Sequence, residues 1–325
     1  MTGKLMKTAF AAVVLAGALV PAGVVLAQKP AAGDALDVVQ VRPNFYMIAG
    51  AGGNIAVQVG PQGAVVVDSG RAEMADAVVA AIKRLTNEPI RWVINTGADD
   101  EHVGGNEKLS KAGKALGGGI LTGGAAPVIG VEEVVNRMSA LVGGKSRYPV
   151  NAWPTESFSR KQKALYLNDD PIVVMRQMAA HSDSDTIVFF RRSDVVVTGD
   201  VFDPTRFPVI DLEHGGSIQG EIDTLNGLID LVVSSVPLPW NPGGTLVVPG
   251  HGRVCEQAEI VDYRDMVTIV RNTIQRMISK GMTLDQIKAA NPTQGFRNQY
   301  GSDTGAWTTD MFVEAVYKGL AGKKS

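Results

Sequence analysis

The chain has 325 residues, of which 45% are hydrophobic and 20% charged, and its formal net charge is −2 at pH 7. These values exclude a disordered or fibrous protein and are typical of a globular one. The sequence has no basic excess and no stripe of Lys and Arg interleaved with aromatic residues, which argues against a nucleic-acid partner.

The first 27 residues have the pattern of a secretory signal peptide. Lys4 and Lys7 give a positive start, an apolar run covers Ala9 to Leu26, and Ala27 ends it with a small residue. An uncleaved membrane anchor is the alternative, because the run is close to the ~18 residues that a spanning helix needs. With cleavage we expect a periplasmic or secreted protein without membrane attachment, in which residues 28–36 form a linker.

The first half of the remaining chain alternates between strands and helices. Apolar runs predict four closely spaced strands, paired in antiparallel order, over residues 38–41, 45–48, 55–59 and 64–68. The pattern then predicts a helix, a strand, a helix, a short strand and a helix over residues 73–85, 91–94, 106–115, 120–122 and 131–142. The stretch from Tyr148 to Ser159 has two prolines and no clear period, which is typical of a loop at the rim of a site.

The second half repeats this order. We expect strands over residues 162–167, 172–178, 186–190 and 195–198, then a helix over 217–233 and a strand over 246–248. The double order predicts an α/β fold, a four-layer αβ/βα sandwich of two mixed β-sheets flanked by helices. We assign residues 37–255 to this domain. Residues 256–325, with helices expected over 258–280, 284–290 and 308–320, form a C-terminal helical extension whose sequence reveals no chemistry.

Potential metal ligands and acid/base groups gather in one loop. Asp99, Asp100, Glu101 and His102 follow the strand over 91–94, and a solvated acidic loop is the simplest interpretation of such a run. Four more such groups stand at strand ends or between strands: Asp68, His181, Asp200 and His251. Because strand ends of one polarity can converge on one edge of a layered sheet, we expect a single site. Its imidazole and carboxylate groups suit zinc, manganese or iron.

The order of these groups resembles the metallo-β-lactamase fold superfamily over about residues 37–254. The phrases Val67-Asp68-Ser69-Gly70, Val197-Thr198-Gly199-Asp200 and Pro249-Gly250-His251-Gly252 are typical of its non-lactamase hydrolase branches. The central motif of that family usually reads His-x-His-x-Asp-His after Asn-Thr. In this chain the corresponding positions are Gly97, Asp99, Glu101 and His102, so the motif departs from the pattern.

The resemblance implies two neighbouring metal sites bridged by Asp200. One site would keep His181, with Asp99 as a substitute ligand and no side chain from Gly97. The other site would keep His102 and His251, with Glu101 in place of the usual Asp. We therefore expect one firmly bound ion, zinc first, with manganese or iron favoured by the added oxygen ligands. Residues expected to support the ligands from behind are Asp68, Asp100 and His214.

Three functions remain open. The first is an exported metal-dependent hydrolase that uses a metal-activated water on an ester, lactone, amide or lactam-type bond of a small-molecule substrate. In it, Glu101 or Asp99 would act as base or orient the water, and His181 would hydrogen-bond the developing oxyanion. The second is a catalytically inactive protein of the same fold that keeps the cleft for a small molecule or partner. The third is metal-dependent redox chemistry. Kinship alone does not predict β-lactam hydrolysis, because fold does not carry substrate.

Overall fold

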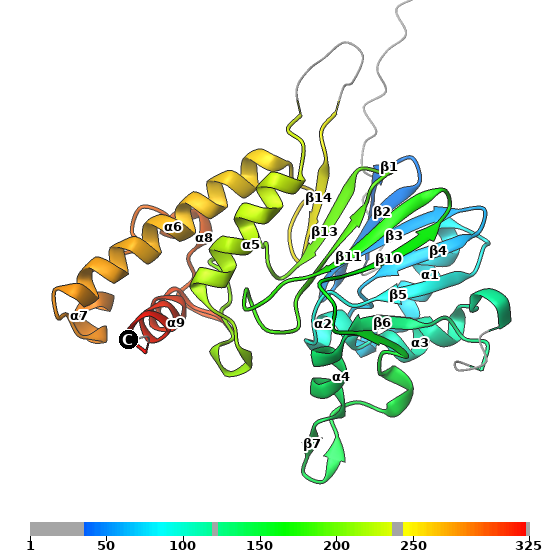
Figure 1. The fold of residues 1–325 in the computed structure, drawn as a ribbon, viewed down its shortest axis with the longest axis horizontal. Coiled ribbons are helices and arrows are strands. Elements are labelled where there is room, and N and C mark those ends of the chain that lie inside the picture. Colours follow the sequence, from blue (N-terminus) through cyan, green and yellow to red (C-terminus); the bar gives the residue numbers. More distant parts are fainter. Residues whose placement is uncertain (1–35, 119–122, 236–242, 323–325) are drawn as a thin grey trace, which may run out of the picture.

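The computed structural model describes residues 36–118, 123–235 and 243–322 (Figure 1). The signal peptide predicted over residues 1–27 lies outside the described residues. So does the linker predicted over 28–36, apart from Leu36, and the short strand predicted over 120–122.

The first half of the domain forms a seven-stranded mixed sheet with the strand order β1-β2-β3-β4-β5-β6-β9. The strands from β1 to β4 pair antiparallel, whereas β4, β5, β6 and β9 run parallel to one another. The helices α1 (Ala75–Leu85) and α3 (Asn106–Ala112) cover its outer face. The strands are β1 (Asp37–Arg42), β2 (Phe45–Ala51), β3 (Gly53–Gly60), β4 (Gly63–Val67), β5 (Ile90–Ile94), β6 (Val128–Val131) and β9 (Glu156–Phe158).

The second half forms a five-stranded sheet in the order β10-β11-β12-β13-β14. Its strands pair antiparallel except for β13 and β14, which are parallel. The helices α5 (Ile218–Leu231) and α6 (Gln257–Ser279) cover its outer face. The strands are β10 (Gln162–Leu167), β11 (Asp170–Arg176), β12 (Thr186–Phe190), β13 (Val195–Gly199) and β14 (Leu246–Pro249).

The two sheets pack face to face, and central strands such as β4 and β13 are buried on both faces. In β4, Val65 and Val67 point into the core between the sheets, whereas Val66 points toward α1. In β13, Val195 and Val197 likewise enter the central core, and the residue between them faces α5 and α6. Alternate side chains of one strand thus pack into two different cores, so consecutive positions of the strand are apolar. This is why these strands appear in the sequence as continuous runs of valine. The predicted four-layer αβ/βα sandwich is confirmed (Figure 1).

Four short strands differ from the sequence prediction. β6 occupies residues 128–131, where the sequence predicted only the first residue of a helix, and α4 (Glu132–Ser139) follows it directly. A short apolar run that is buried on all sides has no period to separate strand from helix. The hairpin of β7 (Leu141–Val142) and β8 (Lys145–Ser146) replaces the predicted end of that helix, and β9 lies within the predicted loop.

The C-terminal helices share a core with the second sheet. They are α6, α7 (Leu284–Ala289), α8 (Arg297–Tyr300) and α9 (Thr309–Ala321), which lies beside α6 and α7 (Figure 1). Phe312 of α9 stacks on Phe207, in the segment between β13 and α5, with the ring centroids 4.8 Å apart. The helical extension is therefore joined to the loop that leads away from Asp200. Within the described ranges, no helix has the length and apolar character needed to cross a membrane.

Candidate metal centre

The candidate site residues all come from segments at one edge of the sandwich. Asp68 follows β4, the loop and short helix after β5 carry Asp99 to His102, Asp200 follows β13, and His251 follows β14. Because β4 and β5 are parallel, and β13 and β14 are parallel, the carboxyl ends of each pair reach the same edge. His181 joins them from the loop between β11 and β12.

Asp200 lies at the centre of this group. Its Oδ2 is 3.0 Å from Nε2 of His102 and 3.9 Å from Nε2 of His181. Its Oδ1 is 3.7 Å from Nε2 of His251, and this buried oxygen has no hydrogen-bond partner among the described residues. Gly250 makes the approach possible, because a Cβ at that position would stand 2.7 Å from the same Oδ1. An orphaned carboxylate oxygen beside an imidazole nitrogen is the arrangement that a cation satisfies.

Two sets of possible donors share Asp200. In the first, Nε2 of His181 lies 3.1 Å from Oδ2 of Asp99. In the second, Nε2 of His251 lies 2.9 Å from Oε1 of Glu101. Within each set the donor atoms, including one oxygen of Asp200, lie within 4.8 Å of one another. The first set joins the residues that the resemblance implied, with Asp99 as the substitute carboxylate. The second set joins Glu101 and His251 at Asp200, and His102, which the resemblance also placed there, lies beside it with Nε2 3.0 Å from Oδ2 of Asp200.

His102 is held from behind by Asp68. Oδ2 of Asp68 lies 2.9 Å from Nδ1 of His102, and the same carboxylate accepts bonds from the backbone N–H and the hydroxyl of Thr96, at 2.8 and 2.7 Å. Nδ1 is thereby engaged, and Nε2 is directed at Asp200. Gly199 leaves room for this arrangement, because a Cβ there would stand 2.4 Å from the Thr96 hydroxyl.

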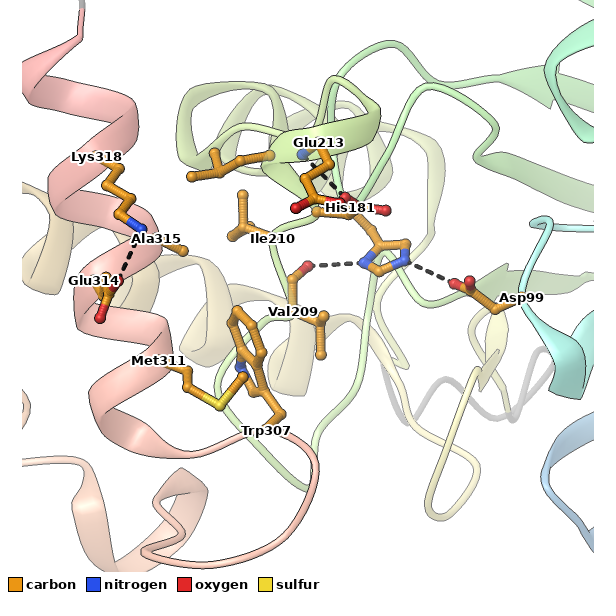
Figure 2. Close-up of a pocket in the computed structure, with 12 residues that line it drawn as sticks. Asp99, His181, Val209, Ile210, Glu213, Trp307, Met311, Glu314, Ala315 and Lys318 are labelled. Carbon is orange, nitrogen blue, oxygen red and sulfur yellow. Dashed lines mark hydrogen bonds and ion pairs between the residues drawn. The ribbon is translucent and has the colours of Figure 1, made fainter. Parts of the chain in front are cut away.

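His181 is oriented by the backbone. Its Nδ1 lies 2.8 Å from the carbonyl oxygen of Val209 and donates to it, so Nε2 faces Asp99 (Figure 2). Asp185 fixes the loop, because its carboxylate accepts bonds from the backbone N–H and the hydroxyl of Ser182. Because Nδ1 is bonded to the backbone, Nε2 is the ring nitrogen that faces the site, where it donates while protonated and can bind an ion once that proton is displaced.

Two of the imidazoles, those of His102 and His181, carry raised pKa values. Burial alone would lower the pKa of His102, but the charges of Asp200 and Asp68 raise it well above its ordinary value. Burial acts in the same way on His181, where the hydrogen bond to Asp99 and nearby carboxylates raise the pKa to about 10. A divalent ion would replace the protons of such imidazolium groups.

The carboxylates carry lowered pKa values. Burial opposes ionisation of Asp200, but the neighbouring imidazoles, His102 first, hold its pKa far below the ordinary value. Asp99 and Glu101 each accept a hydrogen bond from an imidazole, which lowers their pKa values too. All three are therefore anionic at neutral pH, and the donor chemistry of the cluster fits a divalent cation.

Two of the predicted supporting residues lie at the rim instead. Asp100 is exposed and bonds to Arg147 at 3.0 Å and to the Tyr148 hydroxyl. It begins α2 (Asp100–Val103), and successive helical side chains diverge by about 100°, so Asp100 cannot share the inward direction of Glu101. His214 is exposed, and its Nδ1 lies 2.5 Å from Asp211 of its own turn.

Three features of the site were missed from the sequence. Arg71 lies 3.4 Å from Oε2 of Glu101, and its place directly after the Asp68-Ser69-Gly70 turn could have suggested it. The carbonyl of Val209 has no signal in the sequence, because any residue supplies one. The third feature is a cavity of about 710 Å³ that runs from Asp99 and His181 to α9 (Figure 2).

Comparisons with known proteins identify the family to which the fold belongs. The family described as "Metallo-beta-lactamase superfamily" matches residues 49–251 of this chain. A comparison with curated proteins finds no match.

Solved structures agree with the family match. The sec-alkylsulfatase Pisa1 from Pseudomonas sp. is similar with a TM-score of 0.64 and 14% identity, over 86% of this chain and 49% of that one. A metallo-beta-lactamase from Pontibacter korlensis is similar with a TM-score of 0.55 and 15% identity, over 72% of this chain and 99% of that one. The chain thus spans about half the length of the sulfatase, and at these identities the likeness concerns the fold.

Proposed function

Because this chain belongs to the metallo-beta-lactamase superfamily, we propose that it is a metal-dependent hydrolase of small molecules with an ester, lactone, amide or lactam-type bond. The observation that carries the proposal is Asp200. One of its oxygens is buried without a partner among the described residues, and two histidine–carboxylate pairs stand on either side of it. A shared carboxylate between two donor sets is an arrangement built for cations rather than for packing.

We assign the firmly held ion to the donors Glu101, Asp200 and His251, with His102 beside them. Each set supplies one imidazole nitrogen, and we expect His102, whose Nε2 lies 3.0 Å from Oδ2 of Asp200, to add a second nitrogen to this set. Zinc suits the nitrogen-richer set, and the oxygen ligands also admit manganese or iron. The chemistry that a divalent ion supplies in such a site is a water with its pKa lowered from ~15.7 to near 7, and polarisation of the bond under attack.

The side chains of the site supply orientation and charge. Asp99 has 41% of its side chain exposed, lines the cavity and is anionic, so it can orient a water by accepting its hydrogen bond. Arg71 and His251 hold Glu101 from two sides, which fixes the direction of that carboxylate. Nε2 of His181 faces the cavity and can donate to a developing oxyanion.

The substrate panel for this proposal should include sulfate monoesters. The similar structure Pisa1 is named as a sec-alkylsulfatase. Since the present chain spans only about half of that protein, sulfate esters stand beside carboxylic esters, lactones, amides and lactams as candidates.

The second candidate is a protein that binds in the cleft without catalysis. Gly97 supplies no side-chain donor, and Asp99 stands where the family usually has histidine. A cluster that bound no divalent ion would favour this function.

We also propose that the protein is exported. Lys4, Lys7 and the apolar run up to Ala27 support cleavage of a signal peptide. Sequencing the amino terminus of the protein from a periplasmic fraction should give Gln28 as the first residue. A chain that still begins at Met1 in the membrane fraction would contradict the proposal.

Metal content and hydrolysis test the main proposal together. Protein purified without chelator should hold near one equivalent of a divalent metal and hydrolyse at least one member of the panel. His251→Ala should lose both properties, whereas His214→Ala, a histidine outside the cluster, should keep both. Metal-free wild-type protein that does not respond to added Zn²⁺ or Mn²⁺ would refute the proposal.

A further inference from the structure

The cavity beside the candidate metal centre has two walls from distant parts of the chain. One wall follows Asp200 in the segment that carries Val209, and the other is α9 with the loop before it (Figure 2). At one end lie Asp99 and His181, so the cavity opens directly onto the predicted reaction centre. Its volume of about 710 Å³ is within the range of small-molecule sites.

Most of the cavity wall is apolar. Six of its lining residues carry hydrocarbon, aromatic or thioether side chains: Val209, Ile210, Leu212, Trp307, Met311 and Ala315. An indole ring and a flexible thioether offer a surface that adapts to an aliphatic group.

Two of the acidic groups in the lining, Glu314 and Asp211, have partners of their own. Both oxygens of Glu314 are bonded, to Lys318 at 2.8 Å and to Lys288 at 2.8 Å. Asp211 accepts bonds from its own turn and lies 2.5 Å from Nδ1 of His214. A ligand that enters here therefore meets an apolar surface beside hydrogen-bonded carboxylates, with Glu213 at the exposed side of the lining and the polar groups of the metal centre at one end.

We infer that this cavity binds an aliphatic chain of the substrate and holds the bond to be cleaved at Asp99 and His181. The inference rests on the proposed function and names its substrate class: esters or lactones with a linear alkyl or acyl chain. The C-terminal extension thereby acquires a role that its sequence did not reveal, since α9 supplies the wall that selects for chain length.

Binding of linear primary alcohols tests the inference without any hydrolysis. From butanol to octanol, each added methylene should tighten binding to the full-length protein about fourfold, as measured by titration calorimetry. Met311→Asp places a charge in the apolar wall and should weaken octanol binding at least tenfold, with a much smaller effect on butanol. Ile269→Asp is the matched control, because Ile269 is an exposed residue of α6 that does not line the cavity, and it should leave the series unchanged.

Two results would overturn the inference. One is a wild-type affinity that does not change with chain length. The other is a Met311→Asp protein, shown to be folded by circular dichroism, that keeps the wild-type series. If that variant does not fold, Met311→Gln replaces it, with a reduced dependence on chain length as the expected result.

Hydrolysis of p-nitrophenyl esters separates this inference from the proposed function. If kcat/KM rises from butanoate to octanoate and the alcohols show the same trend, both stand. If alcohols bind by chain length but no ester, lactone or sulfate is hydrolysed, the cavity assignment stands and the hydrolase proposal fails. If esters are hydrolysed at rates independent of chain length and alcohols do not bind, the hydrolase proposal stands and the cavity assignment fails.

Discussion

Asp68→Asn should weaken metal binding although Asp68 contacts no candidate ion. Its buried carboxylate, 1% exposed, accepts three hydrogen bonds, two from Thr96 and one from His102. The amide of Asn removes the negative charge beside the imidazole of His102, and its NH₂ group places a hydrogen-bond donor where the carboxylate has an acceptor. The backbone φ of 66° is one that Asn also adopts, so the substitution changes the chemistry and not the turn.

The magnitude follows from those bonds. Hydrogen bonds to buried charges contribute about 1.5–3 kcal/mol each, so we expect a stability loss of about 2–4 kcal/mol in urea denaturation. Loss of the group that orients a ligand should weaken Zn²⁺ or Mn²⁺ binding about 10- to 100-fold, as measured by titration calorimetry.

Asp170→Asn is the matched control for this experiment. Asp170 is equally buried, and it accepts bonds from Arg192, Ser193 and Gln58 at the start of β11, outside the metal centre. It should lose a similar amount of stability and keep wild-type metal affinity. Wild-type metal affinity in Asp68→Asn, or equal losses in both variants, would refute the argument.

Three further predictions concern protons, a buried acid and the altered motif. Because the pKa of His102 is raised well above its ordinary value, ion binding at pH 7 must displace the proton of this imidazole, and affinity should increase about tenfold per pH unit for each proton displaced, until that pKa is reached. Calorimetry in two buffers with different ionisation enthalpies counts the protons, and a pH-independent affinity would contradict this. Glu221 is buried with both oxygens unpartnered among the described residues, and burial raises its pKa well above the ordinary value. Ionisation of such a buried acid destabilises the folded protein, and this cost grows as the pH rises above the pKa of the group in the unfolded chain. Glu221→Met should therefore raise the free energy of unfolding by about 1–3 kcal/mol, and by more at pH 8 than at pH 5. Urea denaturation at pH 5 and pH 8 measures the free energy of unfolding, and equal stability of variant and wild type at pH 8 would contradict the prediction. Gly97→His should add a donor to the His181 set and raise bound metal toward two equivalents, because a Cβ there has only ordinary contacts, the nearest at 3.5 Å from Cδ2 of His102. Metal analysis that still finds one equivalent would count against it.

The fold was predictable because the strands of both sheets leave a strong local pattern. Runs such as Val65-Val66-Val67 are apolar on both faces, and turn residues separate them. β6 and β9 were missed because each is short and pairs in parallel, β9 at the sheet edge and β6 next to it, and neither period nor turn marks them.

The candidate site was predictable only in part. The positions of Asp68, Asp200 and His251 after strands indicated a common edge, and the structure brings them together. The directions in which the side chains of Asp100 and His214 point depend on local turns. The sequence does not specify the position of such turns to within a single residue. The wall formed by Met311 and Trp307 depends on the docking of α9, a long-range contact with no local signal.

The most direct test of the account is anomalous diffraction at the zinc edge from crystals of the full-length protein grown with Zn²⁺. We expect a peak next to the unpartnered Oδ1 of Asp200, within bonding distance of His251 and Glu101, and its absence in Asp200→Ala. A wild-type map with no peak at that oxygen, or with zinc bound only elsewhere, would contradict the central claim that Asp200 is the shared ligand of a metal centre.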